Sequence, residues 1–166
     1  MSLPSMVKWL VIAVVVLALL ALGAGQMGLL RGSVPTDLGV RAGKLKAPSA
    51  TANSVSSQAA LHPDHPQRNH AAIAPLPLKG DGRATLARIR AIVETMEGGG
   101  VVKSESDYLH AEFRTRLMGF VDDVEFWFDP VAQAIQVRSA SRIGRSDFDA
   151  NRKRIEDVRA ALATKD

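Results

Sequence analysis

The sequence contains no cysteine and few aromatic residues, and both shortages narrow the functions open to it. None of the 166 residues is cysteine, so the chain has no disulfide to mark an oxidising compartment, no thiol nucleophile and no lipoprotein attachment site. Aromatic residues make up 5% of the chain, which is few for base-stacking surfaces. We therefore do not expect nucleic acid as a partner, although the net charge of +4 would permit it.

Motifs that carry catalysis or hold cofactors are also missing. The chain has no Gly-x-Ser-x-Gly elbow and no phosphate-binding glycine loop of the Walker type. The run from His62 to His70 has metal-ligating residue types, but it lies among prolines and its spacing matches no standard zinc pattern. We expect no metal, no cofactor and no catalytic residue; an enzymatic role is left open, with a non-enzymatic role favoured.

One long apolar run is present at the amino terminus. From Trp9 to Leu30 only Gln26 is strongly polar, and about 20 such residues suffice to span a bilayer as a helix. A cleavable signal peptide is the alternative, because Lys8 precedes the run and Ala21 to Ala24 are small enough for a cleavage site. We favour an uncleaved anchor over residues 1–31, since apolar residues continue past those small ones. The membrane is thus the expected partner of this segment.

The rest of the chain divides into a tether and a domain. Residues 32–79 are rich in Pro, Ser, Ala and Thr, without sustained periodicity, and predict an extended tether that drapes over the domain. Residues 80–166 predict the domain itself. Helical spacing of apolar residues indicates one helix over 82–96 after Asp81, and another over the last segment, starting near Ser146 to Asp149.

Between the two helices the apolar period is two, as in half-buried strands. We expect strands over 108–117, 121–129 and the residues around 135–139, with a shorter one near 101–106. The predicted fold class is α+β: a small antiparallel sheet of three to four strands packed by two helices, with the other face solvated, preceded by a transmembrane helix and a tether.

Strand alternation divides the carboxylates of the 121–129 segment. Asp123 and Glu125 share the polar face, where Arg114, Arg116 and Arg138 are expected as cross-strand partners. Asp122 lies on the apolar side with Val124, so it needs a buried partner. We expect that partner to be an arginine of the 139–147 loop or a set of backbone N–H groups.

The 139–147 loop combines serines and arginines ahead of a helix N-terminus, a combination that could bind an anion or could be structural. The basic cluster Arg152 to Arg154 is expected to be a solvated helix face. The candidate ligand-binding residues are the polar side chains of this junction: Ser56, Ser57, Asp122, Arg138, Ser139, Ser141, Arg142, Arg145, Ser146, Asp147 and Asn151.

Several blocks of the sequence together resemble a known family. The blocks are Asp37 to Val40, Leu45, Asn53 to Gln58, His70 with Ile73 to Leu76, Tyr108, Gly119 to Glu125, and Val137 to Asp147. They resemble the family called domain of unknown function 1499, over about residues 37–163. The resemblance implies a membrane-tethered or exported small domain, with no established activity.

This chain departs from the family pattern at two places. Pro48 and Ser54 stand where the family often carries a pair of cysteines, so a thiol or disulfide role cannot operate here. Asp149-Ala150 stands where a Gly-Val pair is usual, and the lost glycine argues against a close backbone approach to a ligand at that helix start.

The resemblance also bears on location. By the positive-inside count, Arg31, Arg41, Lys44 and Lys46 after the apolar run favour a cytoplasmic domain over Lys8 before it. The family placement implies export instead, and we follow it: a single-pass protein of the cytoplasmic (inner) membrane with a periplasmic C-terminal domain.

The expected function is that of a membrane-anchored envelope protein acting as a binding or structural module through its Ser/Arg/Asp cluster. An anionic small ligand or an envelope protein would be its partner. Two alternatives stay open: a hydrolase-like enzyme using Asp122 or Asp123 with a serine hydroxyl, and a scaffold that docks a protein on the exposed sheet.

Overall fold

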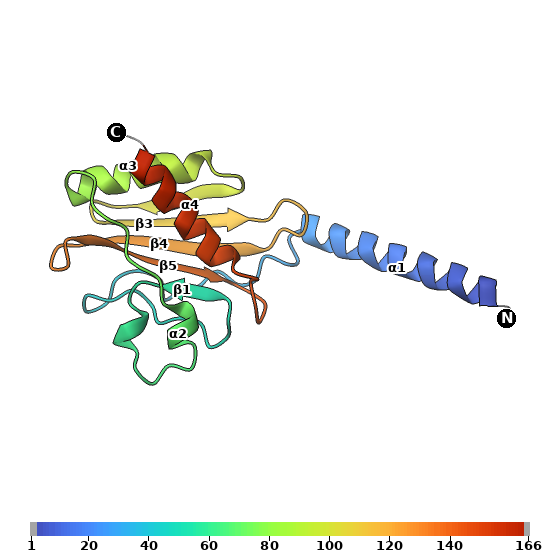
Figure 1. Ribbon diagram of the computed structural model, residues 1–166. Helices are drawn as coiled ribbons and strands as arrows, with labels where there is room; N and C mark the ends of the chain where they lie inside the picture. Colours follow the sequence, from blue (N-terminus) through green and yellow to red (C-terminus); the bar gives the residue numbers. More distant parts are fainter. Residues whose placement is uncertain (1–2, 165–166) are drawn as a thin grey trace.

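The computed structural model describes residues 3–164, so residues 1–2 and 165–166 of the predicted anchor and domain lie outside the described residues. The chain begins with one long helix, α1 (Leu3–Gln26), which projects away from an α+β domain (Figure 1). From Pro4 to Gln26 this helix is long and apolar enough to cross a membrane, as a single-pass anchor or a signal sequence would be.

The domain is built on one antiparallel sheet of five strands. The strands are β1 (Ser54–Ser56), β2 (Gly99–Ser104), β3 (Tyr108–Arg114), β4 (Val121–Asp129) and β5 (Ala134–Ser141), in the spatial order β1-β5-β4-β3-β2. This confirms the predicted fold class, with one strand more than the three to four expected. The additional strand is β1, which comes from the segment predicted as a tether and pairs with β5.

Two helices cover one face of the sheet, here called the helix face. They are α3 (Gly82–Thr95) and α4 (Ala150–Thr164), and both lie on the same side of the strands in Figure 1. Asp81 caps α3, because its carboxylate accepts a hydrogen bond of 2.7 Å from the Ala84 N–H. The apolar stripes of both helices pack on alternate residues of β3, β4 and β5. The largest fully buried side chains of this core include Ile89, Leu109, Phe126, Ile135, Ile155 and Leu162.

The opposite face is not solvated, and that expectation was wrong. Residues 35–48 lie over it, so we call it the tether face. The Gly39 N–H donates to Glu125, and Leu45 packs with Tyr108 and Trp127 in a second, smaller apolar cluster. Glu125 is consequently 0% exposed. Both faces of the sheet are thus covered over β3, β4 and β5, and the exposed part of the sheet is the edge strand β2, where Val102 is 55% exposed.

Two short helices complete the segment between the tether face and α3. The 3-10 helix η1 (Ala59–Leu61) and α2 (Arg68–Ala71) follow β1, and the chain then passes beside the start of β5, where Leu76 exchanges backbone hydrogen bonds with Ile135. The side chain of Leu76 is fully buried in the main core. Residues 54–76 are therefore part of the packed domain.

The run Gly98-Gly99-Gly100 between α3 and β2 offers a matched test of the turn. Gly98 has φ +75°, and a Cβ there would lie 2.2 Å from the Arg114 carbonyl oxygen, whereas a Cβ on Gly100 would meet nothing within 4 Å. We predict that Gly98→Ala lowers the free energy of unfolding by at least about 1–2 kcal/mol, the cost of a left-handed residue with a Cβ. Gly100→Ala should change it by less than about 0.5 kcal/mol. Urea unfolding of the two variants would measure this, and equal effects would contradict the explanation.

Candidate functional site

The predicted ligand-binding residues do not form one site, because the sheet separates them into two clusters. Asp122, Ser139, Ser141 and Asn151 belong to the helix face or its edge. Arg138 and Arg142 belong to the tether face together with Asp123. Hydrogen bonds and ion pairs engage most of the buried polar atoms of each cluster, although Asn53 Oδ1 and Glu125 Oε2 accept no hydrogen bond. The two clusters are described in turn.

Asp123 is the centre of the first half of the tether-face cluster. Arg142 donates two hydrogen bonds of 2.8 Å to its two carboxylate oxygens, and His110 lies across the strand pair with Nε2 2.9 Å from Oδ1. The same Arg142 also contacts Glu112. Asp123 is 1% exposed, so its charge is compensated entirely within the protein. The partners expected for this carboxylate, Arg114 and Arg116, do not reach it.

Glu125 is the centre of the second half. Its Oε1 accepts hydrogen bonds of 2.8 Å from the Tyr108 hydroxyl and 2.7 Å from the Gly39 N–H. Arg138 stands opposite in the β4–β5 register, with Nη1 3.6 Å from Glu125 Oε2, as the cross-strand argument predicts. Arg138 Nε also donates to the Ala47 carbonyl at 3.2 Å. The tether is thus bonded directly to the buried charges beneath it.

The ionisation of these groups reflects burial and pairing together. Burial alone would raise the pKa of Asp123, but hydrogen bonds from Arg142 and His110 outweigh it and hold that pKa below 3.8. Burial and the neighbouring Glu125 charge raise the pKa of Tyr108, so its hydroxyl stays a donor. Hydrogen bonds from Asp123 and Glu112 raise the pKa of Arg142, whereas burial lowers that of Arg138.

The helix-face cluster begins with Asp122, whose partner differs from the one expected. Arg154 of α4 donates a 2.6 Å hydrogen bond to Asp122 Oδ2, instead of an arginine from the 139–147 loop. Arg154 also lies over the ring of Phe113, 4.6 Å from its centroid. The expectation that residues 152–154 form a solvated face was therefore wrong for Arg154. Arg152 is half-buried as well and donates to the carbonyls of His70 and Ala72.

Asn151 connects the remaining polar groups of the helix face. It is fully buried; its Nδ2 donates to the Asn53 carbonyl, to Ser141 Oγ and to Asp147 Oδ2 at 2.7–3.1 Å. Its Oδ1 accepts from Ser139 at 2.5 Å and from Arg154 at 2.8 Å. Asp147 additionally accepts from the Asn151 N–H, which caps the start of α4. A cluster that uses each of these polar atoms is structural in character.

The other predicted residues lie apart from both clusters. Ser57 bonds Gln136 and the Val137 backbone, and Ser56 Oγ accepts from the Gln58 N–H. Arg145 is exposed in the loop before α4, and Ser146 Oγ accepts from the Phe148 N–H. Among residues 3–164 no group of three or more His, Cys, Asp or Glu side chains is arranged to hold a metal ion.

Sequence reasoning missed four members of these clusters: Tyr108, His110, Asn53 and Arg154. Tyr108 and His110 alternate with apolar residues in β3 and so point to the polar face. An aromatic ring on that face indicates that another segment of the chain covers it. Arg154 follows Asn151 by three residues and precedes Ile155 and Val158 of the inward stripe, so helical spacing places it near the sheet. The contact of Asn53 with Asn151 spans 98 residues and leaves no local signal.

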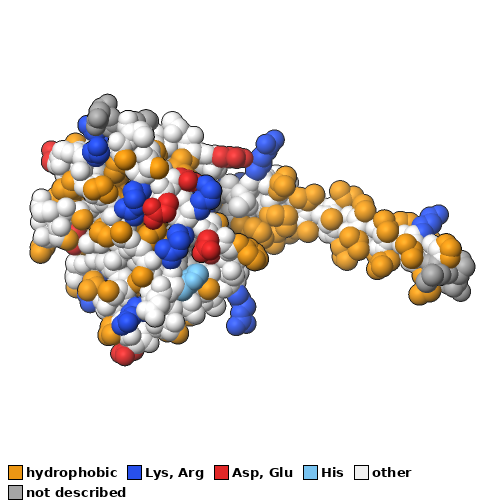
Figure 2. Space-filling model, viewed as in Figure 1, with side chains coloured by type: hydrophobic (Ala, Val, Ile, Leu, Met, Phe, Trp, Pro, Cys, Tyr) orange, Lys and Arg blue, Asp and Glu red, His pale blue; other side chains and the backbone are white. Residues whose placement is uncertain are grey.

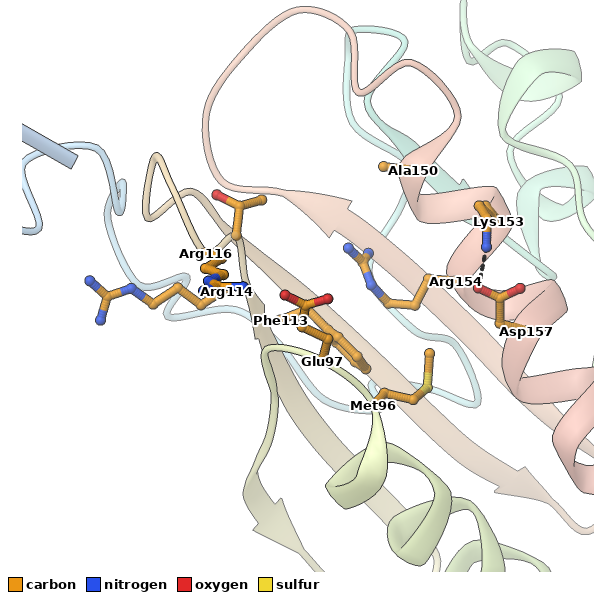
Figure 3. Close-up of a pocket in the computed structure, with 10 residues that line it drawn as sticks. Met96, Glu97, Phe113, Arg114, Arg116, Ala150, Lys153, Arg154 and Asp157 are labelled. Carbon is orange, nitrogen blue, oxygen red and sulfur yellow. Dashed lines mark hydrogen bonds and ion pairs between the residues drawn. The ribbon is translucent and has the colours of Figure 1, made fainter. Parts of the chain in front are cut away.

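Beside the helix-face cluster lies an open cavity of about 620 Å³, here called the basic cavity. Four of its lining side chains are cationic, Arg114, Arg116, Lys153 and Arg154, and two are acidic, Glu97 and Asp157. Figure 3 shows Arg154 of α4 near Phe113, Glu97 and Met96, with Arg114 and Arg116 at the end of β3, where one arginine side chain extends away from the cavity. Lys153 is paired with Asp157 at 2.7 Å, and Arg154 with Asp122. Arg114 and Arg116 are exposed and have no ion-pair partner among the described residues.

A second cavity of about 360 Å³ adjoins the first, sharing Thr115 and Ala150 with it. Phe120, Ile143 and Phe148 give it a mainly apolar lining, and we call it the apolar cavity. Asp122 and Ser141 also line it, but the former is paired with Arg154 and the latter accepts from Asn151. The lining holds no histidine or lysine, so no base is placed to activate Ser141.

Arg142 is predicted to be a structural residue. Arg142→Ala would leave Asp123 and Glu112 without their cation, which should lower the free energy of unfolding by about 3–5 kcal/mol, as for other broken buried pairs. Arg145→Ala, an exposed arginine of the same loop, should change it by less than about 0.5 kcal/mol. Urea unfolding of both variants in detergent micelles tests this. Equal stability of the two variants would refute the structural assignment.

Asp123 should also make stability depend on pH. Its folded pKa is depressed, so its contribution is fully present above the unfolded value of about 3.8 and is lost as pH falls through the folded value. We predict that the free energy of unfolding falls more steeply between about pH 5 and pH 2 in the wild type than in Asp123→Asn. Urea titrations across this range measure the difference, and parallel curves would rule out the contribution.

Comparison with known proteins identifies the family of this chain but no characterised relative. No curated protein and no solved structure matches the chain. The family model described as "Protein of unknown function (DUF1499)" matches residues 44–162, which include every strand and all but the last residues of α4. The chain therefore belongs to this family.

Proposed function

We propose that the protein is a membrane-anchored binding module that holds an anionic group in the basic cavity. The observation that carries this proposal is the unpaired state of Arg114 and Arg116 in that cavity. Arginines in a cavity with unused N–H donors favour carboxylate or phosphate, which they bind with two hydrogen bonds each. The proposed ligand site thus lies beside the helix-face cluster, and Arg154 is the residue that the two have in common.

A comparison with a cavity on the tether face supports this choice. That cavity, of about 350 Å³, is also lined by three cations: Lys46, Arg138 and Arg142. Lys46 pairs with Asp37, Arg138 with Glu125, and Arg142 with Asp123 and Glu112. An anion entering it would compete with carboxylates already in place, whereas at Arg114 and Arg116 it would not.

The pairing of the carboxylates favours binding over hydrolysis. A hydrolase that used Asp122 or Asp123 would need the carboxylate within reach of an unengaged hydroxyl. Asp122 is bonded to Arg154, Asp123 is bonded to Arg142, and Ser139 and Ser141 are bonded to Asn151. Freeing any of these groups would break a buried network.

For location we propose the inner membrane, crossed once by α1, with the domain on the periplasmic side. Alkaline phosphatase or green fluorescent protein fused after Asp166 tests the orientation in a Gram-negative host. We expect phosphatase activity and no fluorescence. Alkaline phosphatase is active only outside the cytoplasm, and green fluorescent protein does not become fluorescent when it is exported in an unfolded state. Fluorescence without phosphatase activity would place the domain in the cytoplasm, as the positive-inside count favours.

For binding, inorganic phosphate is the probe, with the full chain in neutral detergent micelles. A ligand at ten times its Kd stabilises the folded state by about 1.4 kcal/mol, so phosphate should raise Tm in the wild type. The double variant Arg114→Ala, Arg116→Ala should lose the part of the increase in Tm that comes from phosphate binding.

Phosphate also stabilises proteins by exclusion from their surfaces, so the informative quantity is the difference between variants. The matched control is Arg41→Ala, which removes an exposed cation from the tether on the opposite side of the sheet. It should respond to phosphate as the wild type does. An undiminished response in the double variant would exclude the basic cavity as the site.

A further inference from the structure

Several large apolar side chains are exposed to solvent at one end of the sheet. Two loops meet there: residues 115–120 between β3 and β4, and residues 142–149 between β5 and α4. They are neighbours because the Arg142 N–H donates to the Val121 carbonyl at 3.0 Å. Leu117 is 65% exposed and Phe148 94% exposed, and Phe120 and Ile143 are exposed beside them. We call these four residues the end surface.

The end surface is continuous with the helix α1. Gln26 Nε2 donates to the carbonyls of Arg116 and Leu117 at 3.1 and 2.8 Å. Gly25 is packed so tightly against Met118 that a Cβ would lie 2.5 Å from its carbonyl oxygen. A Cβ on Gly32 would lie 2.8 Å from Ile143. Figure 1 shows α1 leaving the domain from this end, and Figure 2 shows apolar side chains where the helix meets the domain.

The backbone holds Phe148 outward at a cost. Phe148 and Asp149 both have φ in the left-handed region, +51° and +64°, although neither is glycine. Packing of the Phe148 side chain does not explain the strain there, since almost all of that side chain faces water. Strained residues of this kind occur where function needs a side chain in one place.

We propose that the end surface is a membrane-docking surface, in which Leu117, Phe120, Ile143 and Phe148 enter the headgroup layer of the bilayer crossed by α1. The proposal rests on the anchoring function proposed above. A helix of 23 apolar-rich residues fills the hydrocarbon core, so the loops bonded to its last residues lie at the lipid–water boundary. Aromatic and aliphatic side chains gain free energy by entering that boundary.

The charges around the end surface suit the same boundary. Arg31, Arg116 and Arg145 are exposed there and can reach lipid phosphates while their stems stay apolar. Of the acidic residues in the two loops, Asp147 accepts a hydrogen bond from Asn151 at the start of α4, whereas Asp149 is largely exposed and lies 4.0 Å from Arg152.

Tryptophan quenching by lipids with brominated acyl chains tests the docking in the full chain, reconstituted in phosphatidylcholine vesicles. The natural Trp9 lies in α1, and Trp127 is buried in the domain. In a Trp9→Phe background, Phe148→Trp should lose most of its added emission in brominated vesicles. The matched control is Val131→Trp, since Val131 is 93% exposed in the turn at the opposite end of β4 and β5. It should keep its emission.

The outcomes separate docking from anchoring. Quenching of Trp9 in the wild type together with quenching of Phe148→Trp, but not of Val131→Trp, supports docking. Quenching of Trp9 without quenching of Phe148→Trp or of a second reporter, Leu117→Trp, overturns docking and leaves the anchor in place. Equal quenching at positions 148 and 131 also overturns it, because the domain would then have no fixed orientation. Loss of Trp9 quenching would instead remove the anchor on which the inference rests.

Discussion

The buried charges of the tether face are the constraint on which the rest of the structure depends. Asp123, Glu125 and Arg138 lie on a sheet face that is buried from water. An unpaired charge there would lower the free energy of unfolding by several kcal/mol. Residues 35–48 supply both the cover and part of the bonding, through the Gly39 N–H and the Ala47 carbonyl. The segment after α1 is therefore held in place by the charges beneath it, which sets the path of the chain from α1 to β1.

Strand periodicity predicted β2 to β5 and the two faces of these strands, and helical spacing predicted the buried stripe of each helix, because these follow from local geometry. It did not predict β1, which pairs with β5 across a long stretch of chain. It failed on whether the polar face meets water. A strand in which apolar and polar residues alternate normally has one face exposed to water, so charged residues on that face are predicted to be solvated. Trp127 and Tyr108 on that same face were the available evidence for a cover, since rings of this size are seldom left in water beside ion pairs.

The candidate site was predicted in part for the same reason. Parity correctly separated Asp122 from Asp123, but it could not choose between arginines far apart in sequence. Arg154 reaches Asp122 only because α4 begins after Phe148 and Asp149 turn the chain, and that turn sets the helix over the strand ends. Asp149 has a left-handed φ that glycine adopts without strain, so the glycine that the family resemblance implies at this position would fit there.

The chain uses its arginines in two different ways, and the difference argues for where function lies. Arg138, Arg142 and Arg154 each neutralise a buried carboxylate, so their charges stabilise the folded domain. Arg114 and Arg116 sit just beyond, at the end of β3, with no carboxylate assigned to them among the described residues. Stability does not require two unpaired cations around one cavity, because like charges in proximity repel. They lie next to the loop that binds the end of α1, so in the proposed membrane arrangement this uncompensated charge would meet an anion at the membrane surface.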